Sequence, residues 1–497
     1  MDATLVALAN ARSILLEAFG SVLEPLFELL EAAESFRKTG PTPEATFAFE
    51  KQVEEHTREI GRVVLEEACN AQEPEPEACP QGYWFGGDYY RSLNKKTPRI
   101  VATLFGKITL WRCLYRHSLR TEPALFPLEL NLGLEVSVAT SAFAERVGQL
   151  VVDHEESMVL TWICQRHGVD WGKKTLRKVV ASLADGLASF RAETQKKKLL
   201  AALTTAHQTH GPWQVTLSVG RDGVMVPIRK EKFKEASTAT LAVYDRCGKR
   251  VDTVYLGCMP EEFQQTLSDQ LTDLIKTVLG SWSEQDPRLI YVTDAGHHPR
   301  HYYETVLRNM RHPAHPERKL KWQWVVDFWH ACQYVMKLAN GLFGANTAKA
   351  RIWYQRMRRW LRDRRHGLAH ILRSAGQLQG RRRMGAATSK DYWEAYRFLR
   401  KHSRHMCYWS YKAEGLPIGS GVTEAACKIV FSERMRRSGM TWNRASGQRI
   451  VTLRILHLSG CWEDAWQSHL KSKSEESKKL KKPSCKVSRP KPASKAA

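Results

Sequence analysis

The stretch RLIYVTDAGHHPR, residues 288–300, decides how the middle of the chain folds. A short apolar run ends at Asp294, and Ala295-Gly296 supplies a turn before three basic or potentially basic side chains. Such a run is typical of a buried strand that leads into a helix. An acid at the end of that strand either caps a loop or holds a metal ion.

The segments around this strand predict an α/β domain. Three runs with a period of two come first and are joined by turn residues, WQVTLSVGRDGVMVPIR, STATLAVYDRCG and RVDTVYLGC. A helical pattern then precedes the 288–300 stretch, and a helix near 300–310 and the apolar run KWQWVVDFWH follow it. This order predicts a mixed sheet, with three antiparallel strands, then parallel strands, and helices that flank them.

Length and charge narrow the class of protein. A chain of 497 residues with 43% hydrophobic residues can bury a sizeable core in about three or four domains. The net charge of +24 makes nucleic acid an expected partner, although a merely basic or ribosome-associated protein has the same composition. Residues 1–80 hold 16 acidic and 6 basic side chains, a net charge of −10, so the remainder carries +34. The acidic start is expected to pack or self-associate, and the basic body to meet the polyanion.

Composition also divides the rest of the chain. We expect an acidic helical region and linker at 1–98, a β-hairpin at 99–135, a helical region at 136–205, and a disordered basic tail at 466–497. The 11 scattered cysteines, without a CxxC pair or a secretory leader, are read as reduced thiols in a cytosol. No apolar stretch approaches the length of a membrane span.

The 136–205 region has the layout of a helix-turn-helix. An apolar helix runs to Gln165, a glycine-containing turn follows, and a basic helix starts at about Lys173. The second helix of this motif enters the major groove of DNA with its N-terminal end. The candidate contacts are Lys173, Lys174, Arg177 and Lys178. Helical bundles produce the same layout without binding DNA.

Three acids stand out by their positions. Asp222 lies in the first strand region, Asp294 ends the buried strand, and Glu424 lies in the first turn of a helix after a Gly-Ser-Gly loop. Each has an ordinary structural interpretation as a turn or helix-start acid. If they converge, however, their carboxylates suit Mg²⁺, and two such ions promote phosphoryl displacement.

Several motifs together resemble a known family. Asp222-Gly223 on a first strand, VTDAG on a fourth, VVDFWHA on a fifth and IGSGVTEAACK…RMRRSGMTW late in the chain are similar to bacterial insertion-sequence transposases of the DDE type, more narrowly the Kra group. The resemblance covers about residues 105–462. It implies an RNase-H-like catalytic domain (206–334 and 413–465), two Mg²⁺ or Mn²⁺ ions, and cleavage and joining of DNA at the terminal inverted repeats of an element and at target DNA. It also implies a bacterial cytoplasmic protein associated with the nucleoid, and we expect a homo-oligomer on DNA and no membrane partner.

The resemblance assigns roles to individual residues. Asp222, Asp294 and Glu424 become the catalytic, metal-binding acids, and Asp327 with His330 becomes an auxiliary active-site motif. Asp327 is the alternative second metal acid, since it too ends an apolar strand. Relatives often carry a zinc ribbon before the catalytic domain, but the nearby cysteines lack its spacing here, so no structural zinc is expected.

The long interval before Glu424 predicts an inserted helical domain. Asp294 and Glu424 are 130 residues apart, and the pattern at 335–412 is helical and basic. Arginine neutralises phosphate and an aromatic ring can stack on an unpaired base. The candidate DNA contacts are Arg358, Arg359 and Trp360 in this insertion and Lys428, Arg434, Arg436, Arg437 and Trp442 near the last acid. A solvated helix face with a core tryptophan explains the insertion residues equally well.

Two other functions remain open from the sequence. A transposase-derived protein that binds DNA without cutting it would share these motifs. An RNase-H-like nuclease would cleave without joining. The DNA that flanks the gene distinguishes a transposase from the first alternative. Short inverted repeats on both sides would mark a mobile element and favour the transposase.

Overall fold

The structure is a computed structural model that describes residues 19–380 and 385–482 and divides into two compact units. Unit 1 comprises Met1–Leu187 and Trp466–Ala497, and unit 2 comprises Ala188–Ala465. The start of the predicted acidic helical region, residues 1–18, and the end of the predicted basic tail, residues 483–497, lie outside the described residues. Each unit is described by itself.

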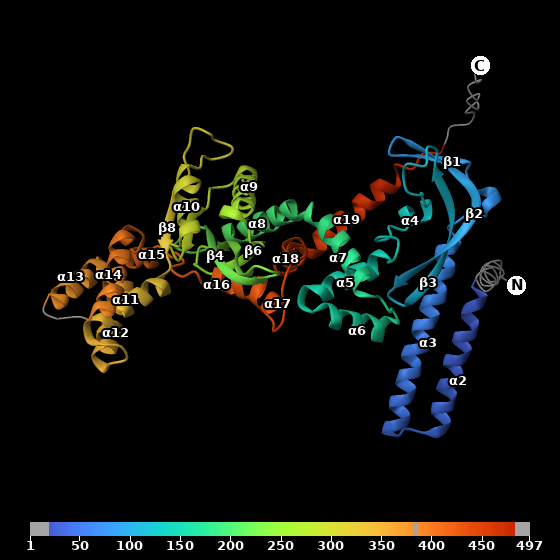
Figure 1. The fold of residues 1–497 in the computed structure, drawn as a ribbon, viewed down its shortest axis with the longest axis horizontal. Helices are drawn as coiled ribbons and strands as arrows, with labels where there is room; N and C mark the ends of the chain where they lie inside the picture. Colours follow the sequence, from blue (N-terminus) through green and yellow to red (C-terminus); the bar gives the residue numbers. More distant parts are fainter. Residues whose placement is uncertain (1–18, 381–384, 483–497) are drawn as a thin grey trace, which may run out of the picture. The chain divides into compact units, whose positions relative to one another are not determined.

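Unit 1 combines a helical hairpin, a small sheet and a helical cluster (Figure 1). Its elements, apart from short 3₁₀ turns, are α2 (Leu23–Thr39), α3 (Pro43–Asn70), β1 (Gly82–Phe85), β2 (Asp88–Thr103), β3 (Gly106–His117), α4 (Pro127–Asn131), α5 (Ser141–Asp153), α6 (Glu156–His167), α7 (Lys173–Ala188) and most of α19 (Trp462–Ser477). The acidic helices α2 and α3 lie side by side, as predicted. Apolar residues of α3 and of the sheet form a shared core, which includes Cys69, Val101, Ile108 and Leu110.

The predicted linker before residue 99 is wrong. β1 and most of β2 occupy it, so the sheet is a three-stranded antiparallel meander rather than one hairpin. The turn between β1 and β2 is Gly86-Gly87, with φ values of +63° and +95° that only glycine adopts readily. A Gly-Gly pair between runs of aromatic residues is a hairpin signal. The prolines and acids just before it hid that signal in the sequence.

The predicted helix–turn–helix layout is present in unit 1. Helix α6 ends at His167, Gly168 follows in the left-handed conformation with φ +62°, and α7 begins at Lys173. Left-handed glycine satisfies the last carbonyls of a helix and stops it there. The apolar face of α7 is fully buried and contains Leu176, Val179 and Leu183. The layout is therefore confirmed, whereas DNA binding by it stays a prediction.

The first part of the predicted disordered tail is helical and packed. Helix α19 continues to Ser477, and its His469 and Lys473 both bind the carboxylate of Glu135, each at 2.8 Å. Glu135 is 1% exposed. Its burial alone would raise the pKa, but the hydrogen bonds from His469, Lys473 and Ser182 outweigh burial and lower the pKa to about 2. The segment has few apolar residues, so its sequence did not predict a packed helix. The helix is held in place by its contacts with the buried Glu135.

This buried pairing predicts the effect of Glu135→Ala. The substitution leaves the buried His469 and the partly buried Lys473 without their partner, so we expect a loss of about 2–4 kcal/mol in the stability of unit 1. Trypsin should then cut more rapidly after Lys471 and Lys473, which gel electrophoresis and mass spectrometry measure. Because the Glu135 pKa is lowered, its contribution should persist above pH 4.5 and vanish as the pH falls through about 2.

The matched control is Glu475→Ala, an exposed acid on the same helix. It should leave both the unfolding transition and the cleavage rate unchanged. Equal protease resistance of Glu135→Ala and the wild type would contradict the assignment.

Unit 2 is built on a five-stranded mixed sheet. Its elements, apart from short turns and one π-helical segment, are α8 (Arg191–His207), β4 (Thr216–Ile228), β5 (Lys232–Tyr244), β6 (Arg250–Cys258), α9 (Gln265–Ser281), β7 (Arg288–Thr293), α10 (His297–Thr305), β8 (Trp322–Val326), α11 (Phe328–Phe343), α12 (Ala348–Asp363), α13 (Gly367–Gln379), α14 (Ala386–Lys401), α15 (Tyr408–Ala413), α16 (Gly421–Ala426), α17 (Glu433–Met435) and α18 (Arg444–Leu458). The strand order is β6-β5-β4-β7-β8. The first three strands are antiparallel, and β4, β7 and β8 are parallel, as the sequence predicted.

Alternation along the strands gives the sheet two different faces. Val219, Ala239 and Leu241 point to one face and join the core that contains residues of α8 and α9. Gly220 and Thr240, one residue away from two of these, point to the other face, which α16 covers. Asp222 has the same parity as Gly220 and therefore belongs to the α16 face.

The predicted insertion at 335–412 is helical, but it is not a separate compact body. One continuous core includes sheet residues such as Ile290 and Val325 and helical residues such as Leu342, Trp353 and Tyr392. The predicted boundary at residue 205 is also wrong, because α8 packs on β5, β6 and α9 in unit 2. Over the described parts of both units, the structure contains no helix of the length and apolarity that crossing a membrane requires.

Candidate active site

Asp222 and Asp294 are brought together by the parallel pairing of β4 and β7. The register pairs Gly220 with Val292, and its continuation by two residues sets Asp222 level with Asp294. Asp294 follows the last residue of β7, and its Oδ1 accepts a hydrogen bond of 2.8 Å from the backbone N–H of Gly296. Asp222 Oδ1 accepts from the N–H of Gly223, also at 2.8 Å. Both acids thus have one oxygen fixed by the backbone.

Glu424 lies on α16. This helix can lie close to β4 only because Gly220 has no side chain. A Cβ at Gly220 would lie 2.0 Å from Oγ1 of Thr423. That hydroxyl and the hydroxyl of Thr240 are 2.8 Å apart. Helix α16 therefore rests directly on β4 and β5, and Glu424 is the next residue along it. Glu424 is exposed, and its Oε1 accepts a hydrogen bond of 3.1 Å from Ser420 Oγ.

Asp294 and Glu424 both act electrostatically on Asp222. The pKa of Asp222 is raised to about 6, chiefly by burial and also by the charges of Asp294 and Glu424, while the Gly223 N–H and the Cys427 thiol oppose the shift. Like charges in close proximity disfavour ionisation. The predicted acids, which are far apart in sequence, therefore lie near one another at the carboxyl end of β7.

The donor set suits a hard divalent cation, but it is not closed around one. Carboxylate oxygens are the ligands that Mg²⁺ and Mn²⁺ prefer, and a cation would relieve the repulsion at Asp222. In residues 19–380 and 385–482, however, no group of three or more His, Cys, Asp and Glu side chains is arranged to hold a metal ion. A cation that binds here has to draw the acids closer together than they lie in this structure.

Asp327, which the sequence offered as an alternative metal ligand, is hydrogen-bonded to the backbone. It is fully buried, and its two oxygens accept hydrogen bonds from the backbone N–H groups of His330 and Ser420. Both oxygens are thus used by the backbone, and Asp327 caps α11 and fixes the loop before Glu424. The alternative of Asp327 as the second metal acid is therefore not favoured, because it sits among N–H donors rather than among acids.

His330 lies in an aromatic cluster next to this cap. Its ring makes edge-on contacts with Tyr334 and Phe398, with centroid distances of 5.3 and 5.9 Å. The pKa of Tyr334 is raised by burial, then by the charges of Glu394 and Asp294. His330 thus occupies a packing position, and its auxiliary role stays a prediction.

Cys427 is a neighbour of the acids that the sequence reasoning missed. Its thiol is buried and hydrogen-bonds to Asp222, and burial together with the charges of Asp222 and Glu424 raises the thiol pKa. The available signal was the spacing, since positions three apart on a helix share a face with Glu424. A π-helical segment begins at Cys427 and ends at Ser432. The carbonyl of Val430 in that segment accepts a 3.0 Å hydrogen bond from the buried Arg454.

The predicted DNA contacts divide by exposure. Several are on the surface, namely Lys173, Lys174, Lys178, Arg359, Lys428, Arg436 and Arg437. Arg177 is also exposed, but it is held by a two-pronged ion pair with Glu156, with both distances 2.7 Å. Arg358 is partly buried and lies over the rings of Trp329 and Tyr354. DNA binding by these residues stays a prediction.

Three of the predicted contacts have structural tasks. Arg434 is 2% exposed and lies 5.2 Å from the ring of Trp442, so its prediction as a surface contact is wrong. Trp442 is partly buried and donates its indole N–H to the carbonyl of Met435 at 3.0 Å. Trp360 has the guanidinium groups of Arg356 and Arg364 at 4.8 Å each, which occupy the ring surface that a base would need.

The comparisons with known proteins do not identify the chain. No protein-family model matches it. No curated protein matches it either.

The close approach at Gly220 predicts a pair of substitutions that compensate for each other. Gly220→Ala should destabilise unit 2 by about 1–3 kcal/mol, because the added methyl overlaps the Thr423 hydroxyl and pushes α16 away. Adding Thr423→Ala removes the overlapping atom and should recover part of this loss. Chemical denaturation of the four proteins of the double-mutant cycle measures the coupling. Gly172→Ala, where nothing surrounds the glycine, is the control, and strictly additive effects would contradict the contact.

The raised pKa of Asp222 predicts how stability depends on pH. Its folded pKa of about 6 exceeds the ordinary value of 3.8, so its contribution is fully present below pH 3.8 and is lost as the pH rises through 6. Asp222→Asn should therefore raise the stability of unit 2 above pH 7, in the presence of a chelator, by at most about 3 kcal/mol. The gain should shrink below pH 4.

Thermal unfolding at several pH values measures this difference. Asp273→Asn, on the exposed side of α9, is the control and should show no comparable gain. If Asp222→Asn were no more stable than the wild type at neutral pH, the crowding of charges at Asp222 would be disproved.

Proposed function

We propose that the protein is a DDE transposase that binds the ends of an insertion sequence and catalyses metal-dependent strand cleavage and strand transfer. The observation that carries the proposal is the convergence on Asp222 of Asp294 and Glu424, whose charges both act on it. A basic body with a net charge of +34 outside the first 80 residues suits a DNA substrate.

The topology of unit 2 supports the same proposal. Three antiparallel strands followed by two parallel strands, in the order β6-β5-β4-β7-β8, suit an RNase-H-like catalytic domain. That fold holds one acid on the first strand, a second after the fourth strand and a third on a late helix. Asp222, Asp294 and Glu424 occupy these three places.

The proposed chemistry assigns a task to each group. Asp222, Asp294 and Glu424 would hold two divalent ions, Mg²⁺ or Mn²⁺, which supply charge stabilisation to both oxygens of an in-line displacement. The Gly223 and Gly296 N–H groups orient Asp222 and Asp294 toward their neighbours. In cleavage, a water oxygen bonds to phosphorus and the 3′ oxygen leaves with a proton. In transfer, that 3′ hydroxyl attacks a target phosphate, so one phosphodiester bond forms as another breaks.

An assay on the DNA that flanks the gene tests the proposal. End-labelled fragments with both flanks should be cut at inverted repeats and joined to target DNA in the presence of Mg²⁺. Asp222→Asn, Asp294→Asn and Glu424→Gln should each lower both steps by at least about 100-fold while DNA binding changes little. Asp273→Asn, a surface acid far along the chain from these positions, should behave as the wild type.

The other outcomes identify the alternatives. Cleavage without joining would indicate a nuclease on the same fold. Binding without any cleavage by the wild type would indicate a transposase-derived DNA-binding protein. Mg²⁺-dependent cleavage by the double variant Asp222→Asn/Glu424→Gln would refute the assignment of the site.

A further inference from the structure

A second candidate site lies at the other end of the parallel strands. A pocket of about 560 Å³ is formed by residues that precede or begin β4, β7 and β8. The three acids lie beyond the carboxyl end of β7, which is six residues long. At about 3.3 Å per residue, the pocket and the acids are thus separated by roughly 20 Å along the strand. The pocket is therefore not part of the proposed active site.

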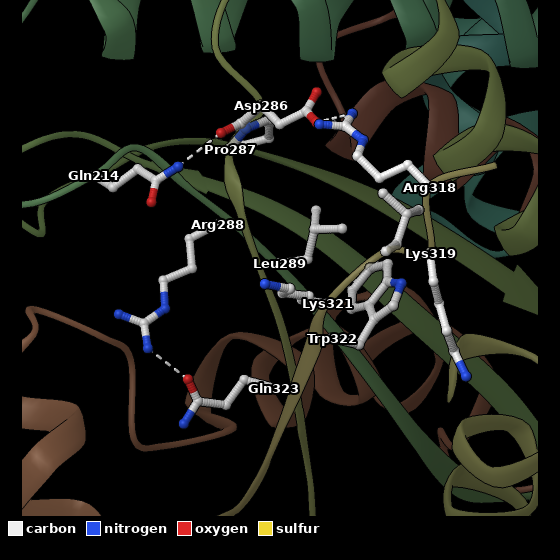
Figure 2. A pocket seen from close by; sticks show the side chains of 11 residues that line it. Gln214, Asp286, Pro287, Arg288, Leu289, Arg318, Lys319, Lys321, Trp322 and Gln323 are labelled. Carbon is white, nitrogen blue, oxygen red and sulfur yellow. Dashed lines mark hydrogen bonds and ion pairs between the residues drawn. The ribbon is translucent and has the colours of Figure 1, made fainter. Parts of the chain in front are cut away.

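The floor of this pocket is apolar and includes an indole donor without an acceptor. Leu289, Leu320 and Trp322 line it, and Figure 2 shows Leu289 and Trp322 between the polar side chains of the rim. Trp322 is 8% exposed, and its indole N–H has no hydrogen-bond partner in the chain that the structure describes. A buried donor without an acceptor is costly. The indole nitrogen is itself enclosed, so Trp322 contributes apolar surface to the floor rather than a hydrogen bond.

The rim carries positive charge that the protein itself does not neutralise. Arg318 pairs with Asp286, and Arg288 donates to Gln323 Oε1 at 2.6 Å (Figure 2). Arg288 also pairs with Glu414. Lys319 and Lys321 are exposed and, among the described residues, have no acid partner. Two lysines beside an apolar floor present a cationic edge to any molecule that enters.

Amide groups complete the lining. Gln214 donates its Nε2 to the carbonyl of Asp286 at 2.8 Å and has a further amide oxygen, while Gln323 accepts through Oε1 and hydrogen-bonds to the hydroxyl of Tyr411. The amide oxygen of Gln214 can accept a hydrogen bond from the edge of a nucleobase. An apolar floor, amide groups and a lysine edge in a pocket of this volume suit a flat, polar-edged ring that carries an anionic group.

We propose that this pocket binds a single nucleotide, with the base on Leu289 and Trp322 and the phosphate on Lys319 and Lys321. The inference does not rest on the transposase function, since the site is separate from the three acids. The nucleotide has two possible sources, a free mononucleotide and an unpaired nucleotide at the end of a DNA strand. Both present the same base and phosphate to the pocket.

Calorimetric titration of the full chain with small probes tests the free source. Adenosine 5′-monophosphate should bind at least tenfold more tightly than ribose 5-phosphate or inorganic phosphate, because only the nucleotide fills the apolar floor. Lys319→Glu/Lys321→Glu should weaken that binding by roughly tenfold or more, since each lysine loses a charged contact with phosphate. Lys249→Glu/Lys276→Glu changes the net charge equally at exposed positions of the same unit and should bind as the wild type.

Titration with DNA tests the second source. A short duplex with one unpaired terminal nucleotide should bind more tightly than the blunt duplex, and the Lys319→Glu/Lys321→Glu variant should lose this preference while the control pair keeps it. A preference in either arm that the lysine variant loses supports the proposal and identifies the source. If neither arm shows a contribution from the base, or if the lysine variant binds every probe as the control pair does, the proposal is overturned.

Discussion

The close contact between Gly220 and Thr423 is the constraint on which the candidate site depends. Only a strand position without a side chain lets α16 lie directly on the sheet, where the Thr423 and Thr240 hydroxyls meet at 2.8 Å. Glu424 is the next residue after Thr423, so the contact that fixes Thr423 also fixes the backbone of Glu424. The third acid is therefore placed by the contact of the preceding residue with the sheet, to which its own side chain adds a hydrogen bond from Ser420.

Placing the acids close together is electrostatically unfavourable because their charges repel one another. The packing of the rest of unit 2 offsets this repulsion. The pKa of Asp222 is raised first by burial and then by its two acidic neighbours, so the ionised site is destabilising on its own. The opposite face of the same strands is fully buried against α8 and α9, with Val219 and Leu241 in the core. Apolar burial on one face thus holds in place a cluster of charges on the other. Such opposition of stability and charge is typical of catalytic and binding sites.

The sequence predicted the periodic parts of this structure and missed those that depend on tertiary contacts. The strands from Thr216 to Cys258 and the helical pair around Gly168 have strong local patterns, and both were found. The C-terminal helix was missed because its order comes from the buried Glu135, which is remote in sequence. For the candidate site, the sequence context of the acids was enough to identify Asp222, Asp294 and Glu424. It did not show which of the predicted arginine contacts are buried. Arg434 looks like a surface cation in sequence and is enclosed only once Trp442 folds over it.

The hydrogen bonds of Asp327 explain how Glu424, which is 130 residues after Asp294, can hold a fixed position near it. Four hydrogen bonds close the base of the helical stretch between β8 and α16. The N–H of Asp327 donates to the carbonyl of Thr293, the N–H of Phe328 donates to the carbonyl of Ile418, the N–H of Ser420 donates to the Asp327 carboxylate, and the Tyr408 hydroxyl donates to the carbonyl of Val326. The first of these bonds ties this closure to the residue before Asp294. A displacement farther out in α12 or α13 therefore has to break buried hydrogen bonds before it can move Glu424 away from the other two acids. The two ends of the helical stretch are thus joined to each other and to β7 at the residue next to the second acid.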